Sequence, residues 1–213
     1  DIGYTLGALY EYSDQTRFGI GYRSQVKHKL KGDIKFEGLM LPANQDISAR
    51  ITTPANLTIG AYHDINDKWS VMAEFGRTYW SSFDTLDIYG ENNGKMSTTE
   101  ERWKDTTFYA IGASYQYNDQ WKFRVGFAVD QSAVGQEYRT PRIPDSDRLW
   151  YSSGIEYKYN DDWTFNLGYT YIRADKGKVK LLGYHDGDNA RGSLQADYEN
   201  DIHILGFGAS YNF

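Results

Sequence analysis

Histidine and carboxylate side chains are the residues in this sequence that could support acid–base catalysis or bind a metal ion. The chain of 213 residues contains four histidines, His28, His63, His185 and His203, and no cysteine. None of these histidines has a Ser or Asp at a spacing typical of a nucleophile and its base. Residues 185–189, His-Asp-Gly-Asp-Asn, alternate two carboxylates as a calcium loop does, but the later glutamate of such a loop is missing. We therefore expect a solvated loop there, and we expect no catalytic centre, no metal site and no cofactor.

The composition excludes several other classes of protein. A formal net charge of −6 and a pI near 5.2 argue against a nucleic-acid binder. The 6 Trp, 19 Tyr and 10 Phe supply enough apolar surface to argue against wholesale disorder. No stretch approaches the roughly 18 consecutive apolar residues that a membrane helix requires. No signal peptide precedes Asp1, which is consistent with a cytosolic, a processed or a shortened chain.

Alternation of apolar and polar residues with a period of two dominates the chain, and it is typical of strands with two different faces. In residues 121–130 the odd positions are Trp, Phe, Val, Phe and Val, and the even positions are Lys, Arg, Gly, Ala and Asp. Residues 109–117, 163–171 and 205–213 repeat the pattern. The apolar rows end in aromatic residues, and each strand has about 10 residues, as expected for barrel strands that cross a bilayer. The apolar rows are therefore predicted to face lipid, and the polar rows the lumen.

Two kinds of connection join the predicted strands. Short turns, most of them rich in Asn and Asp and flanked by Tyr and Trp, occur at residues 10–14, 62–69, 115–121 and 157–163. Long polar connections occupy approximately residues 31–50, 84–102, 132–148 and 174–200. Short turns at one end and long loops at the other are typical of outer-membrane barrels, and a soluble β-sandwich has no reason for that asymmetry.

The predicted fold class is therefore an all-β, antiparallel transmembrane β-barrel. Nine strands are expected, at approximately residues 3–12, 17–30, 51–65, 69–83, 104–117, 121–131, 149–159, 163–173 and 201–213. Bacterial single-chain barrels have even numbers of strands. We therefore expect that an odd number of strands is missing upstream, or that the chain is a fragment or a shortened barrel.

Three strings of the sequence resemble the FadL long-chain fatty-acid transporters of Gram-negative outer membranes. They are YRSQVKHKLKGD at residues 22–33, TPAN at 53–56 and RTPRIPDSDR at 139–148. The likeness runs from the first strand to the terminal Phe213. It implies a fourteen-stranded barrel, plugged by an N-terminal hatch domain, that takes up hydrophobic molecules passively. Residues 1–213 match only the C-terminal nine strands, so the hatch and the early strands have no counterpart here.

The resemblance also implies a site that holds the carboxylate and the tail of a fatty acid. It places an acidic residue at Asp130 and a partner at Arg173, and it makes Arg102 and Lys104 the cationic candidates for the carboxylate. The family's lysine position in that region corresponds to Thr99. The alternation puts Asp130 on the lumen row, but it puts Arg173 on the lipid-facing row unless a bulge intervenes.

Each of these charged residues also has a purely structural interpretation. Asp130 could pair with Arg124 or Lys122 in a polar lattice that lines the lumen. Arg102, Lys104 and Arg173 could be solvated charges at the ends of loops. Other charged residues on the polar rows are interpreted as parts of the same lattice, namely Glu11, Arg17, Arg23, Glu74, Glu156 and Lys158.

The barrel pattern and the resemblance together predict passive transport of long-chain fatty acids or other hydrophobic small molecules across the outer membrane, without catalysis. The expected partners are this cargo, outer-membrane lipid and lipopolysaccharide, with no nucleic acid, and the expected state is a monomer. The alternatives are a general diffusion porin, an outer-membrane enzyme, and a shortened or engineered barrel without transport activity. A porin would pass sugars or ions, whereas a fatty-acid transporter would show saturable protection by oleate-like ligands and little open conductance.

Overall fold

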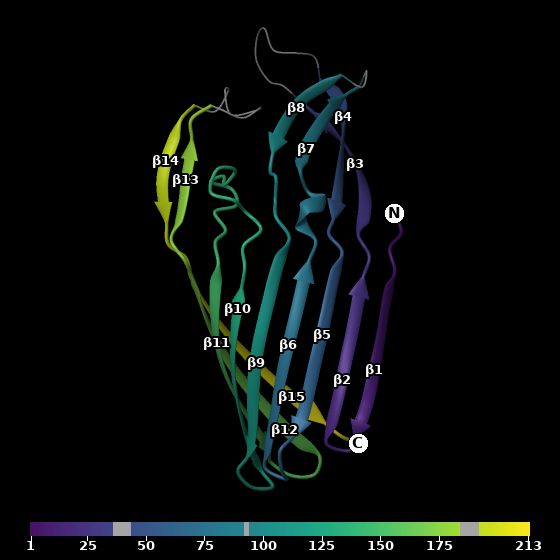
Figure 1. The fold of residues 1–213 in the computed structure, drawn as a ribbon, viewed down its shortest axis with the longest axis vertical. Coiled ribbons are helices and arrows are strands. Elements are labelled where there is room, and N and C mark those ends of the chain that lie inside the picture. The colour runs from purple at the N-terminus through teal and green to yellow at the C-terminus, as the bar shows by residue number, and fades with distance from the viewer. Residues whose placement is uncertain (36–43, 92–93, 184–191) are drawn as a thin grey trace.

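The computed structural model describes residues 1–35, 44–91, 94–183 and 192–213 of the chain. Its main element is an antiparallel sheet of nine strands in the order β1-β2-β5-β6-β9-β10-β11-β12-β15 (Figure 1). The strands span Thr5–Ser13 (β1), Thr16–Arg23 (β2), Asn56–Asp64 (β5), Trp69–Thr78 (β6), Thr106–Gln116 (β9), Trp121–Asp130 (β10), Arg148–Lys158 (β11), Trp163–Ala174 (β12) and Asp201–Tyr211 (β15). The predicted all-β, antiparallel fold class is confirmed.

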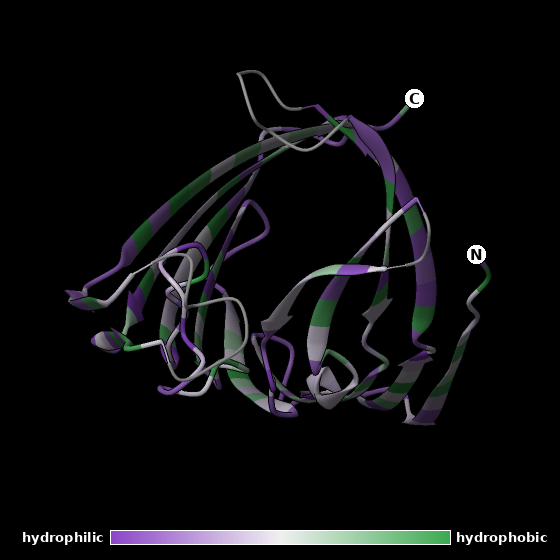
Figure 2. Ribbon diagram, turned by 90° about the horizontal axis from the view of Figure 1, so that it is seen from above, coloured by the Kyte–Doolittle hydropathy of each residue, from purple (hydrophilic) through white to green (hydrophobic). Residues whose placement is uncertain are grey.

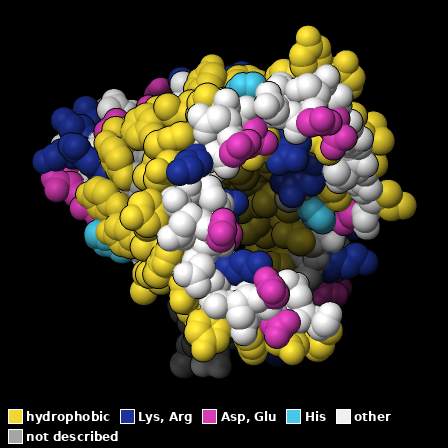
Figure 3. All heavy atoms as spheres, turned by 90° about the horizontal axis from the view of Figure 1, so that it is seen from below, with side chains coloured by type: hydrophobic (Ala, Val, Ile, Leu, Met, Phe, Trp, Pro, Cys, Tyr) yellow, Lys and Arg dark blue, Asp and Glu magenta, His cyan; other side chains and the backbone are white. Residues whose placement is uncertain are grey.

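The nine-stranded sheet curves around a central hollow without closing on itself. Figure 2 shows the curved sheet from above, and Figure 3 shows the hollow from below. Strands β1 and β15 form the two edges, and in the described part of the chain each pairs with a single neighbour. The sheet is therefore a barrel wall that remains open between these two edges.

The two faces of the sheet differ as the alternation predicts. On the outward face, Val125 is 61% exposed, and Leu205 and Phe207 are each 75% exposed. Figure 3 shows hydrophobic side chains mainly around the outside and charged side chains around the hollow. An apolar face of this extent is unusual in a soluble monomer, whereas it is the normal outer surface of a membrane barrel. Among the described residues, no helix has both the length and the apolar character needed to cross a bilayer.

The short turns at the lower end share one hydrogen-bond arrangement. In the β9–β10 turn, Asn118 Oδ1 accepts from the backbone N–H groups of Gln120 and Trp121 at 3.0 and 2.9 Å. Asn66 and Asn160 do the same in the β5–β6 and β11–β12 turns. An Asn side chain that bonds the backbone two residues on reverses the chain tightly. The repeated Asn-Asp motif thereby fixes the position of each hairpin.

The long connections contain strands that were expected to be loops or continuations of other strands, so those expectations were wrong. A four-stranded sheet, in the order β3-β4-β7-β8, and the β13–β14 hairpin rise above the main sheet (Figure 1). Their elements span Val26–Ile34 (β3), Gln45–Thr53 (β4), Thr85–Gly90 (β7), Lys95–Glu100 (β8), Gly177–Leu181 (β13) and Leu194–Tyr198 (β14), with a 3-10 helix at Trp80–Ser82 (η1). The calcium-like run at 185–189 lies outside the described residues.

Two of the expected strands are interrupted where the main sheet meets its extensions. The strand expected at 17–30 breaks at Ser24, which leaves the ladder with β5 and instead pairs with Tyr4, its Oγ accepting from the Tyr4 N–H at 2.9 Å. The strand expected at 51–65 breaks at Pro54, which has no N–H to offer the ladder. Both breaks mark the upper limit of the barrel wall.

The buried apolar side chains lie at the upper end, where loops and extensions cover the sheet. Phe83 directly follows η1, and Ala133 and Val134 lie in the loop after β10. Val179 and Leu181 lie in β13. The small hydrophobic core therefore lies mainly in the region above the wall.

Candidate functional site

A cavity of about 270 Å³ lies between the upper ends of β6, β9, β10 and β11 and the loop of residues 131–147. It combines apolar, aromatic and charged side chains from five segments of the chain. The residues that line it are Thr78, Trp80, Trp103, Thr106, Asp130, Gln131, Ala133, Val134, Ile143, Asp145 and Arg148. Six of these eleven side chains are polar or charged, so the cavity combines apolar surface with groups that could orient a small ligand.

One arginine holds two carboxylates together at this cavity. Asp130 and Arg148 face each other across the β10–β11 ladder. The Arg148 guanidinium donates to Asp130 Oδ2 from Nη2 at 2.9 Å and from Nε at 3.1 Å, and to Asp145 Oδ1 from Nη1 at 2.6 Å. Two contacts from one guanidinium to a single carboxylate are both strong and directional. This triad therefore fixes the loop over the end of the wall.

Two indole rings, Trp80 and Trp103, line the site, and Phe83 packs against Trp103. The Trp103 ring lies edge-on to Trp80 and Phe83, with centroids 4.8 and 4.9 Å apart. Trp103 Nε1 donates to Glu101 Oε2 at 2.9 Å, which fixes the orientation of the indole. Edge-to-face rings are a favourable packing arrangement, and indole faces suit apolar and aromatic ligands.

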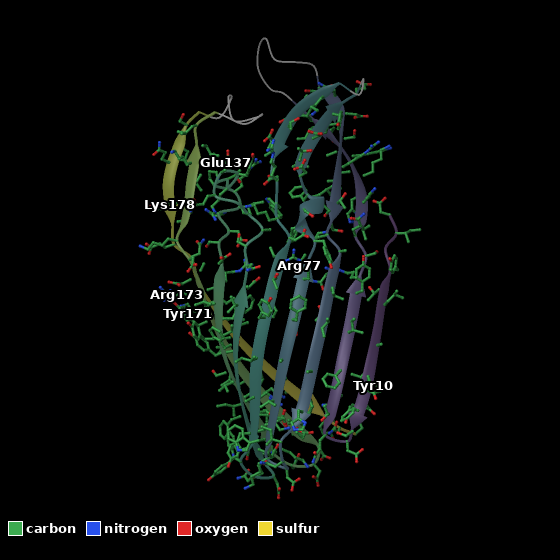
Figure 4. All side chains as sticks on the ribbon, viewed as in Figure 1. Tyr10, Arg77, Glu137, Tyr171, Arg173 and Lys178 are labelled. Atoms are coloured by element: carbon green, nitrogen blue, oxygen red, sulfur yellow. The ribbon has the colours of Figure 1, made fainter. Side chains whose placement is uncertain are left out.

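A second ion pair supports the aromatic wall from below. Arg77 Nη2 lies 3.5 Å from Asp105 Oδ2, and Arg77 also donates to Thr107 Oγ1 at 2.8 Å (Figure 4). The Asp105 carboxylate accepts from the backbone N–H of Ser81, in η1, at 3.0 Å. Partial burial raises the pKa of Asp105, but the hydrogen bonds from Ser81 and the charge of Arg77 outweigh it and hold that pKa below its ordinary value. The ionised Asp105 thereby anchors the helix that carries Trp80.

The buried Arg139 ties the loop over the cavity to β13. Its guanidinium donates to three backbone carbonyls, at Asp145 (2.7 Å), Lys178 (3.0 Å) and Val134 (3.4 Å). Arg139 is only 6% exposed. The loop is therefore a fixed lid whose Val134 and Asp145 point into the cavity wall.

The structure separates the residues that were predicted to act together. Asp130 lines the cavity, but its partner is Arg148, so the expected pairing with Arg173 was wrong. Arg173 lies on the outward row of β12, as its alternation indicated, and Figure 4 shows it outside the wall. The alternative in which Asp130 pairs with Arg124 was also wrong, because Arg124 instead binds Glu156 across the β10–β11 ladder and Asn166. Arg124 and Glu156 confirm the predicted lattice of charges on the inward face.

The two cationic candidates for a carboxylate lie beside the cavity and do not line it. Arg102, which has a positive φ of 42°, contacts Glu100 at 3.3 Å and covers the Tyr138 ring at 5.2 Å. The Lys104 backbone N–H donates to Ala133 O at 2.9 Å. Neither side chain belongs to the cavity lining. Arg148 was not predicted, although it is the last residue of the string at 139–148. Trp80 and Trp103, on either side of the long connection at 84–102, were not predicted either.

A larger hollow of about 830 Å³ lies along the inward face of the wall. Eight glycines contribute to it, and several are paired directly across the ladders, such as Gly19 with Gly60 and Gly154 with Gly168. They are Gly19, Gly60, Gly112, Gly126, Gly154, Gly168, Gly206 and Gly208. A Cβ built at Gly168 or Gly206 would meet no atom within 4 Å. The glycines therefore leave open space where side chains would otherwise project inward.

Comparison with known proteins places this architecture in context. The family described as "Outer membrane protein transport protein (OMPP1/FadL/TodX)" matches residues 1–213. A long-chain fatty acid transport protein of Escherichia coli O6:H1 is 30% identical over 227 residues, covering 100% of this chain and 49% of the relative. Outer membrane protein P1 of Haemophilus influenzae is 29% identical, covering 100% and 47%. The chain thus spans about half the length of these curated relatives.

Solved structures show the same wall. A Pseudomonas aeruginosa FadL homologue superposes with a TM-score of 0.87 at 26% identity, covering 98% of this chain and 52% of that one. The toluene transporter TodX of Pseudomonas putida superposes with a TM-score of 0.66 at 25% identity, covering 99% and 49%. An outward apolar face and an inward polar face define the wall of a β-barrel of the Gram-negative outer membrane. The chain belongs to the FadL/TodX family, which consists of outer-membrane transport channels rather than enzymes.

Proposed function

We propose that the protein binds hydrophobic small molecules in the cavity at Asp130 and Arg148 and passes them along the inward face of the wall, across the outer membrane and without energy input. Long-chain fatty acids are the first candidate cargo, because a relative that covers the whole chain is named for them. The observation that supports this function best is the position of the cavity. It lies at the upper end of the same strands whose glycines leave the hollow of about 830 Å³ open.

The lining of the cavity favours a second candidate cargo, a neutral aromatic compound. Arg148 contacts both Asp130 and Asp145, so a ligand carboxylate would have to displace one of them or bind beside two negative charges. The paired indoles of Trp80 and Trp103 offer apolar surface without such a cost. A cavity of about 150 Å³ is large enough for benzene, so about 270 Å³ leaves room for a substituted ring beside the two indoles. TodX, a structural neighbour, is a toluene transporter.

Uptake by intact cells tests the proposed function. Cells that lack the gene are compared with cells that carry it, using radiolabelled oleate in one experiment and radiolabelled toluene in another. The proposal requires faster uptake of at least one compound when the gene is present, and the faster one identifies the cargo. Equal uptake of both by the two strains rejects the function. Conductance of sugars or ions through the purified protein in planar bilayers would assign it to the diffusion porins instead.

A substitution on the inward face tests the route. Gly168→Trp places a large side chain into open space, because a Cβ at this position meets no atom within 4 Å. We expect it to slow uptake without preventing assembly of the wall. Leu205→Trp, on the neighbouring strand β15, points outward, where Leu205 is 75% exposed, and serves as the control because it does not line the hollow. Equal uptake by the two variants would show that cargo does not pass along this face.

A further inference from the structure

Polar side chains form an unusual cluster on the outward face at the upper ends of β12 and β15. We call the cluster of Tyr169, Tyr171, Arg173, Asp201 and His203 the outer-wall patch. Tyr169 Oη lies 2.8 Å from His203 Nδ1, and Tyr171 Oη donates to Asp201 Oδ1 at 3.0 Å. The rings of Tyr171 and His203 stack with centroids 5.0 Å apart. These residues share the outward rows that elsewhere carry Phe and Leu side chains.

The height of the patch matches the outer boundary of the membrane. Trp163 begins β12 at the lower end, and Arg173 lies ten residues further along the same strand. With about 3.3 Å of rise per residue and a strand tilt of about 40°, the two residues are separated by about 25 Å along the barrel axis. This equals the height of the apolar band of outer-membrane barrels, about 25 Å. Arg173 therefore lies at the level of the lipid headgroups of the outer leaflet.

The Arg173 guanidinium is available to a ligand at this level. Asp201 faces Arg173 across the β12–β15 ladder, but its Oδ1 accepts from Tyr171. Within the described ranges, Arg173 makes no ion pair within 4 Å, and Figure 4 shows it beside Tyr171 on the outside of the wall. A recess of about 570 Å³ lies next to it, with Tyr151, Tyr169, Tyr171 and His203 in its lining. The Tyr169, Tyr171 and His203 side chains have hydrogen-bond partners within the patch, so Arg173 is the group that a ligand would engage.

We propose that the outer-wall patch binds a phosphate group of lipopolysaccharide in the outer leaflet. A guanidinium matches the geometry of a phosphate with two parallel hydrogen bonds, and the Tyr171–Asp201 and Tyr169–His203 hydrogen bonds fix the side chains that surround it. The acyl chains of the same molecule then cover Leu205 and Phe207, which lie lower on the outward row of β15. Lys178, exposed on β13 above the patch, offers a second cation to the sugar-phosphate part (Figure 4). This binding is separate from transport, because it uses the opposite face of the wall.

Native mass spectrometry tests the proposal on the protein that carries this sequence, extracted from outer membranes into detergent and titrated with lipid A. The two probes are bisphosphorylated lipid A and the same lipid without its phosphates. We expect the unmodified protein to prefer the phosphorylated lipid, and Arg173→Gln to weaken that binding about tenfold, as loss of a charge-assisted hydrogen bond predicts. Arg173→Lys, which keeps the charge but not the fork, should fall between the two.

Lys158→Gln is the matched control, because it removes one cation from the opposite end of the wall. It should bind lipid A as the unmodified protein does, and all variants should show the gel mobility of a folded barrel before heating. Equal binding by Arg173→Gln and the unmodified protein overturns the proposal, and so does equal binding of the two lipids. A lipid-free dimer that Arg173→Gln abolishes would assign the patch to contact between two copies of the chain, and would also overturn it.

Discussion

Replacing Arg148 should destabilise the protein far more than replacing its partner Asp130. Arg148 is the cation that Asp130 and Asp145 share, through three hydrogen bonds of 2.6 to 3.1 Å. In Asp130→Asn, the amide oxygen still accepts from Arg148, and Arg148 keeps the charge of Asp145. In Arg148→Met, all three bonds are lost and the two carboxylates, whose side chains are 18% and 24% exposed, lose this cation.

The sizes of the two effects follow from this geometry. Weakening one charge-assisted contact in Asp130→Asn should lower the free energy of unfolding by about 1 kcal/mol. Removing one partner of a fully buried ion pair costs about 3–5 kcal/mol, because the remaining charge is left uncompensated. The residual exposure of Asp130 and Asp145 reduces this, so we expect a loss of about 2–3 kcal/mol for Arg148→Met.

Urea unfolding of the protein refolded into lipid vesicles, followed by tryptophan fluorescence, measures both losses. Arg102→Met is the control, because Arg102 is 56% exposed in its contact with Glu100 and its removal should change the unfolding free energy little. Equal losses for Asp130→Asn and Arg148→Met would refute the reasoning, since they would show that Asp145 does not share the guanidinium.

Three further predictions concern the Trp103 ring, the Asn turns and the pH dependence of stability. Trp103→Ala should weaken binding of the transported compound to the cavity, as quenching of the remaining tryptophan fluorescence would show; unchanged affinity would place the cargo elsewhere. Asn118→Ala should lower the free energy of unfolding by about 1–2 kcal/mol, because two backbone N–H groups lose their acceptor; a urea titration that shows no change would contradict this. Since the folded-state pKa of Asp105 is lowered, the stability it contributes is present above the ordinary Asp pKa of about 4 and is lost as the pH falls through the lowered value. The free energy of unfolding of Asp105→Asn should therefore be lower than that of the unmodified protein at pH 7, and the difference should disappear in acid. A difference that grows in acid would contradict the lowered pKa of Asp105.

The period-two alternation was sufficient to predict which face each wall residue occupies. It placed Asp130 inward and Arg173 outward, and both positions are confirmed. The prediction succeeded because side chains of a regular strand alternate strictly, and one residue of slip would turn every apolar side chain toward the lumen. The resemblance had suggested that the two residues act together, and the alternation contained the evidence against it.

The partner of Asp130 could not be predicted, because it depends on register between strands rather than on position within one. Arg124, six residues earlier on the same strand, lies about 20 Å away at 3.3 Å per residue and is out of reach. Arg148 is 18 residues later in sequence, yet it lies directly opposite Asp130 in the β10–β11 ladder. The site therefore depends on how the loop between the two strands returns the chain.

The extensions above the wall escaped prediction for a different reason. In β3 the residues at 27, 29 and 31 are all lysines, while His28, Leu30 and Gly32 alternate with them, so one row is wholly charged. A strand outside the membrane needs no apolar row, and the alternation there carries no information about where the wall stops. The boundary is instead marked by single residues such as Ser24 and Pro54, whose effect becomes visible only when the neighbouring strand is known.

The Asn turns have a consequence for how a wall of this kind can change in descent. Residues 115–121 and 157–163 repeat the order Tyr-x-Tyr-Asn-Asp-x-Trp, and each closes two strands that are neighbours in sequence and in space. Gain or loss of such a pair of strands leaves the direction of every later strand unchanged, and its polar face still points inward. Gain of a single strand would reverse the direction of every later strand, so that loops at the cell exterior would instead face the periplasm. The hairpin, rather than the strand, is therefore the smallest unit whose gain or loss keeps the orientation of the remaining wall.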